Sequence, residues 1–194
     1  MTRLAYYHSQ IRQLLILWAS IVILFSAERW LMFRHFVPDS IRSQPNLETA
    51  ALFTKGLLFD IKVACITVAL PFLLGLLSLL HPAASRLWQR FQAALLAVLF
   101  AIVAAAAIGN WFYFSVYGHQ FDVFMFGLFD EDTRAVVKTM WADYPVIRGL
   151  IGLIVAIALF AWLLNRSTRR IHPQSHARKS TWFAIILLPI IALT

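Results

Sequence analysis

The chain has 194 residues, of which 61% are hydrophobic and 13% are charged, and its formal net charge is +8. Soluble domains are usually about 45–50% apolar and about 25% charged, so the composition excludes an ordinary soluble domain and favours a membrane protein. In so apolar a chain the basic residues are better interpreted as topology signals than as a nucleic-acid surface, and we expect no nucleic-acid partner. The single cysteine, Cys65, allows no internal disulfide, and we expect it to pack within a helix.

Apolar segments separated by polar links predict the membrane spans. They lie at about 13–33, 57–80, 91–114, 146–164 and 181–194. The first segment lacks a good cleavage site, so we expect an uncleaved span and not a signal peptide. The fifth covers only about 21 Å of helix, less than the roughly 30 Å hydrocarbon layer. We therefore expect residues 1–194 to form one transmembrane domain of a longer protein.

The predicted fold class is all-α. It is a polytopic membrane helix bundle with about five transmembrane helices, the fifth truncated, plus short interfacial helices. In the third span the run AIVAAAAIG is rich in small residues, which suits close helix packing in lipid.

The charges predict the orientation. Segments 1–12, 81–90 and 165–180 hold nine basic residues and no acidic residue. The alternate segments, about 34–56 and 115–145 with their flanks, hold seven basic residues beside eight acidic ones. By the positive-inside rule the N-terminus is cytoplasmic and the 115–145 loop is extracytoplasmic.

The segment 110–145 is the longest that is neither a plain span nor a basic link. It holds five of the nine acidic residues and many aromatic residues. Apolar positions spaced three and four apart predict an interfacial helix at about 131–142. The acids of Asp130-Glu131-Asp132 are interpreted mainly as helix caps, and a divalent-metal site is the less favoured alternative. The aromatic run is interpreted as an interfacial belt, or alternatively as a docking platform for a lipid or an extramembrane domain.

Asp60 and Lys62 are interpreted as the only ionisable residues placed within a span, near its outer end. A structural ion pair or interfacial anchor is favoured, a head-group or substrate contact is the alternative, and a proton relay is the least favoured. With the loop residues, they make up the lipid, head-group or domain-docking candidates: Asp60, Lys62, Tyr117, His119, Asp122, Arg134, Lys138 and Trp141.

The histidines and nucleophiles give no catalytic set. No histidine lies in the middle of a predicted span, so a haem bound within the bilayer lacks ligands. His172 and His176 are interpreted as part of a solvated basic link. We predict no catalytic residue, no metal ligand and no cofactor in this chain.

Two motifs resemble a known family. Gly56-Leu-Leu-Phe-Asp60 at the start of the second span resembles the GLxFD signature of lipoteichoic-acid-synthase-like phosphoglycerol transferases, which belong to the alkaline phosphatase/sulfatase superfamily. The stretch NWFYF followed by YGHQFDVFMFGLFDEDTRAVVKTMWADYP is similar to that family's outward loop after the third span. The resemblance covers about residues 56–145.

The resemblance implies the membrane anchor of a protein in the bacterial cytoplasmic (inner) membrane. A catalytic domain outside the cytoplasm, expected after residue 194, would transfer phosphoglycerol from phosphatidylglycerol with a threonine nucleophile and a divalent metal (Mn or Mg). This chain would bind and present the lipid. The alternatives are a non-enzymatic lipid-binding or scaffold membrane protein and, third, a small transporter.

Overall fold

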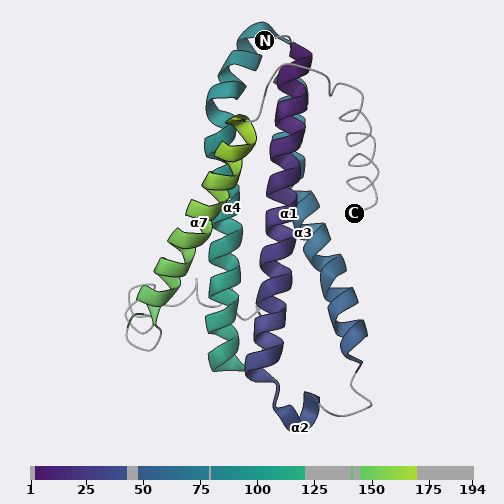
Figure 1. Cartoon of the computed structure of the whole chain (residues 1–194), viewed down its shortest axis with the longest axis vertical. Helices are drawn as coiled ribbons and strands as arrows, with labels where there is room; N and C mark the ends of the chain where they lie inside the picture. Colours follow the sequence, from purple (N-terminus) through teal and green to yellow (C-terminus); the bar gives the residue numbers. More distant parts are fainter. Residues whose placement is uncertain (1–2, 43–47, 79, 121–140, 142–144, 170–194) are drawn as a thin grey trace, which may run out of the picture.

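The computed structural model describes residues 3–42, 48–78, 80–120, 141 and 145–169. Four long helices run alternately up and down in one bundle, with a short helix at one end (Figure 1). They are α1 (Arg3–Phe36), α2 (Asp39–Arg42), α3 (Thr49–Ser78), α4 (Pro82–Tyr117) and α7 (Val146–Arg169). We call the end that carries α2 the α2 end; α1 and α4 finish there, and α3 and α7 begin there. The opposite end is called the N-terminal end.

Each long helix is long and apolar enough to cross a membrane. Within the part of the chain that the structure describes, four candidate spans are found: Ser9–Phe36, Thr49–Ser78, Ala83–Tyr117 and Val146–Ser167. This confirms the predicted all-α membrane helix bundle, and each of the first four predicted spans overlaps one of these helices. The predicted fifth span, 181–194, lies outside the described residues.

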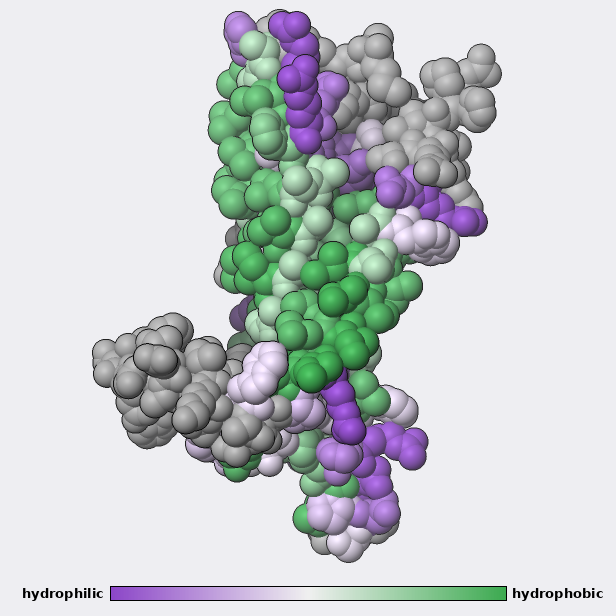
Figure 2. Space-filling model, turned by 90° about the vertical axis from the view of Figure 1, so that its left-hand side faces the viewer, coloured by the Kyte–Doolittle hydropathy of each residue, from purple (hydrophilic) through white to green (hydrophobic). Residues whose placement is uncertain are grey.

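The surface of the bundle is apolar over most of its length. Large side chains such as Phe59, Ile66, Leu77 and Ile154 are exposed. Figure 2 shows this apolar surface in the middle of one face, with hydrophilic residues toward the two ends. Such a surface is unfavourable in water and is the expected lipid-facing surface of a membrane protein.

The core combines small residues with stacked aromatic rings. Ala64 and Ala104 are fully buried, so the helix backbones can approach closely. Phe100 of α4 and Phe160 of α7 stack with their ring centroids 4.3 Å apart. The predicted packing role of the small-residue run is thus confirmed on α4. Cys65 is buried as expected, and its sulfur accepts a hydrogen bond from the Trp18 indole at 3.4 Å.

A proline lies inside α3 without ending the helix. Pro71 is buried, and its carbonyl accepts a hydrogen bond from Gln10 Nε2 of α1 at 3.4 Å. One turn later, a Cβ on Gly75 would lie 1.3 Å from the same Gln10 nitrogen. Gly75 therefore leaves the space in which the Gln10 side chain packs against α3.

The helix boundaries differ from the predicted bounds of the spans and links. The basic residues Arg86 and Arg90, predicted to lie in a link, belong to the first turns of α4. Pro82 occupies the first turn and the His81 ring accepts a hydrogen bond from the Ala83 N–H, which are favourable features of a helix start. At the other end α4 continues through residues 110–117 and stops at Gly118, whose positive φ of 73° suits glycine.

Candidate functional site

A buried ion pair joins α1 and α3 near the α2 end. The Asp60 carboxylate receives two hydrogen bonds from the Arg29 guanidinium, both at 2.8 Å. Ser26, one turn earlier on α1, donates a third at 3.3 Å. Asp60 is 4% exposed, so these bonds replace the water that the carboxylate would otherwise bind. The structure thus places Asp60 in a structural ion pair, the favoured interpretation from sequence.

The partner of Asp60 is on another helix and is not Lys62. Residues two apart on a helix point in different directions. Lys62 is exposed, and its Nζ lies 5.8 Å from the centroid of the Phe59 ring. Lys62 therefore faces the surroundings of the bundle, where its long side chain can reach a head-group layer.

The expectation that Asp60 and Lys62 are the only ionisable residues within a span is wrong. Glu28 and Arg29 lie well inside the candidate span Ser9–Phe36. Glu28 points to α4, where Asn110 Nδ2 donates to its Oε1 at 2.9 Å. The predicted span 13–33 already contains Glu28 and Arg29, but the charge pattern counts them with the outer flank and not as charges within the span. Two neighbouring residues of opposite charge within a long apolar run are the sequence signal that this part of the span makes polar contacts with other helices.

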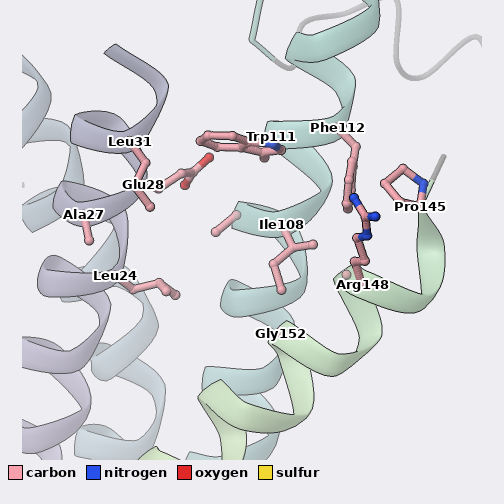
Figure 3. A pocket seen from close by; sticks show the side chains of 12 residues that line it. Leu24, Ala27, Glu28, Leu31, Ile108, Trp111, Phe112, Pro145, Arg148 and Gly152 are labelled. Carbon is pink, nitrogen blue, oxygen red and sulfur yellow. The ribbon is translucent and has the colours of Figure 1, made fainter. Parts of the chain in front are cut away.

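Glu28 also lines a groove between α1, α4 and α7. The groove measures about 450 Å³, within the usual range for small-molecule sites, about 300–1,000 Å³. Most of its lining is apolar, and the residues are Leu24, Ala27, Glu28, Leu31, Ala107, Ile108, Trp111, Phe112, Pro145, Arg148, Gly149 and Gly152. In Figure 3 the Glu28 carboxyl group lies on the α1 side beside Trp111, and Arg148 lies on the α7 side beside Phe112 and Pro145.

Two glycines allow α7 to form one wall of this groove. A Cβ on Gly149 would lie 2.9 Å from Phe112 Cε2 and 3.3 Å from Ile108 Cγ2. The absence of a side chain therefore lets α7 lie close against α4 at this level. A Cβ on Gly152 would meet Ile108 Cδ1 at an ordinary 3.8 Å, so space remains in front of it.

Arg148 supplies the positive charge of the groove. It lies in the first turn of α7, and among the described residues its guanidinium has no ion-pair or hydrogen-bond partner. The N-terminus of a helix adds partial positive charge from its unpaired N–H groups. The sequence alone marks Arg148 only as a topology charge, because its neighbours across the groove come from distant parts of the chain.

The aromatic candidates gather at the end of α4. The ring of Tyr113 is 4.5 Å from that of Tyr117 and 5.4 Å from that of His119, measured between centroids. None of these three residues lines the groove. Trp141 is helical and exposed. The candidates Asp122, Arg134 and Lys138, the acids 130–132 and most of the predicted 131–142 helix lie outside the described residues.

Among the described residues, the buried polar side chains form two groups. At the N-terminal end, buried side chains come from all four long helices: Gln10, Gln13, Ser78, Gln92 and Ser167. Asp60 and its partners form the other group, near the α2 end. On α1 the fully buried residues between them are Leu14, Leu17 and Ile21. The apolar core thus separates the two polar groups along the bundle.

Comparisons of the chain with family models, with curated proteins and with solved structures give no match.

Proposed function

We propose that this chain is a phospholipid-binding membrane domain that holds one lipid in the groove between α1, α4 and α7. The observation that carries the proposal is the composition of the groove: apolar walls within a membrane span and a cation at one side. A phospholipid has the matching parts, since its acyl chain is apolar and its phosphate is anionic. The apolar core between the two polar groups of the bundle disfavours the transporter alternative, because a transport path needs polar groups along its length.

Arg148 is the proposed phosphate ligand. Its planar guanidinium can give two parallel hydrogen bonds to a phosphate, and no described residue competes for them. Lipid tails are as apolar as the helix surfaces, so burial of apolar area gives little net gain within a membrane. We therefore infer that the contact between Arg148 and the phosphate contributes most of the free energy that favours a lipid in the groove over the same lipid in the surrounding bilayer.

The resemblance to phosphoglycerol transferases extends this proposal to an enzyme-like protein of the bacterial inner membrane. The bound lipid would then be of the phosphatidylglycerol type, and an extracytoplasmic domain with a divalent metal such as Mn or Mg would carry out the transfer. The groove would present the lipid head group to that domain. The alternative is that the lipid serves a scaffold without catalysis.

We propose that the α2 end faces outward. The described residues at the N-terminal end include Arg3, Arg12, Arg86, Arg90, Arg166 and Arg169, with no acidic residue among them. Both acidic and basic residues lie toward the α2 end. A phosphatase reporter fused after Gln120 is expected to be active, and one fused after His81 is expected to be inactive, because that enzyme works only outside the cytoplasm. The opposite pattern would reverse the orientation.

Lipid retention by an Arg148 variant tests the proposed function. Arg148→Leu is expected to lower the amount of phospholipid that co-purifies in mild detergent at least about tenfold, because the loss of even one charge-assisted hydrogen bond has an effect of that size. Native mass spectrometry measures this amount directly. The matched control is Arg34→Leu, because Arg34 is also exposed near the α2 end but lies over Trp30 and outside the groove. Equal retention by the two variants would contradict the proposal.

A further inference from the structure

The acidic side of the groove is not explained by phosphate binding. Glu28 is half-buried and lines the groove from α1. A carboxylate repels a phosphate, so Glu28 would weaken the binding of a lipid that offered only its phosphate and acyl chains. The side chain therefore points to a second feature of the ligand.

The hydrogen bonds of Glu28 leave one oxygen available. Oε1 accepts from Asn110 Nδ2 at 2.9 Å, which fixes the position of the carboxyl group beside Trp111. Among the described residues the hydrogen bond of Glu28 is made by Oε1 and not by Oε2, and the neighbouring Arg29 directs both of its terminal nitrogens to Asp60. A carboxyl group within a membrane span is costly unless its oxygens accept hydrogen bonds, and the ligand can supply a donor to Oε2.

Glu28 and Arg148 lie on opposite sides of the same groove, with α4 between them (Figure 3). This arrangement suits a head group that has a phosphate at one end and an N–H or O–H donor at the other. Ethanolamine and glycerol head groups both meet this requirement. A choline head group does not, because its quaternary nitrogen carries three methyl groups and no N–H.

We propose that Glu28 determines the head-group specificity of the groove: it accepts a hydrogen bond from the terminal ammonium or hydroxyl group of a phospholipid whose phosphate is bound by Arg148. The inference rests on the proposed function, because it requires a phospholipid in the groove. It adds the class of lipid, a phosphodiester with a donor-bearing head group, and a residue that selects it.

Competition among three lipids tests this specificity. The purified full chain is incubated in detergent with equal amounts of phosphatidylethanolamine, phosphatidylglycerol and phosphatidylcholine that carry identical acyl chains, and bound lipid is counted by native mass spectrometry. The unmodified protein is expected to bind the first two about tenfold more than phosphatidylcholine, as for one hydrogen bond to a charged group. Glu28→Leu is expected to remove this preference.

Glu28→Gln distinguishes the two donors and protects the test against misfolding. Its amide keeps an oxygen for Asn110 and adds no bulk, so the bundle is expected to fold. If the natural donor is an ammonium group, Glu28→Gln lowers phosphatidylethanolamine binding about tenfold, because the opposite charge is lost. If it is a hydroxyl group, phosphatidylglycerol binding changes less than about threefold, because a neutral acceptor suffices.

The failure of this inference differs from the failure of the proposed function. If Arg148→Leu loses lipid but Glu28→Leu keeps the head-group preference of the unmodified protein, the role of Glu28 is wrong and the groove still binds phospholipid. Equal binding of all three lipids by the unmodified protein would likewise overturn the role of Glu28. If the unmodified protein retains no phospholipid and Arg148→Leu changes nothing, the proposed function itself is overturned.

Discussion

Asp60→Ala is expected to destabilise the bundle by about 3–5 kcal/mol, the usual cost of removing one member of a buried ion pair. The variant leaves the Arg29 guanidinium, which is 19% exposed, without the carboxylate that accepts two of its hydrogen bonds. Ser26 loses its acceptor at the same time. The measurement is the free energy of unfolding in mixed micelles, with a thermal melt in the same detergent as a second readout.

The chain contains its own control for this measurement. Asp39 pairs with Arg42 within α2, but the Asp39 side chain is 92% exposed. Asp39→Ala is expected to cost less than about 1 kcal/mol, because exposed ion pairs contribute little. The double variant Arg29→Leu/Asp60→Leu is expected to recover most of the stability, since it removes both buried charges together. A loss below about 1 kcal/mol for Asp60→Ala would show that α1 and α3 do not depend on this pair.

The lengths and order of the apolar segments predicted the helix bundle well. The apolar segments around residues 13–33, 57–80, 91–114 and 146–164 each became part of a long helix. Composition and length decide this outcome, because a membrane span must satisfy its backbone hydrogen bonds within one helix. The boundaries were less accurate. All four long helices extend beyond the predicted apolar segments at one end or both, since polar residues at a helix end can reach the interface while the backbone stays helical.

The groove could not be predicted from the sequence in the same way. Glu28, Asn110 and Arg148 are each more than 35 positions from the next along the chain. They come together only through the packing of α1, α4 and α7. A local pattern marks each one as a polar residue near a span end, and that pattern is equally typical of a topology signal. The partner of Asp60 was missed for the same reason, because helix pairing decides which charges meet.

Gly152→Leu is expected to block the groove while the bundle stays folded. The glycine lines the groove, and a Cβ there would meet Ile108 Cδ1 at 3.8 Å, so the backbone accepts a side chain without a clash. The remaining atoms of leucine would extend into space that the proposed acyl chain occupies. Gly149 is a poorer choice, because a Cβ at 2.9 Å from Phe112 would also push α7 away from α4.

Stability and lipid retention are expected to change in different directions. Leucine in place of glycine favours a helix by about 0.8 kcal/mol, so the melting temperature should hold or rise. Retained phospholipid should fall about tenfold, because a displaced lipid cannot keep its phosphate on Arg148. Ala158→Leu is the matched control, since Ala158 is an exposed small residue on the same helix and lies outside the groove. If Gly152→Leu retains as much lipid as Ala158→Leu, the lipid is bound elsewhere and the groove is not its site.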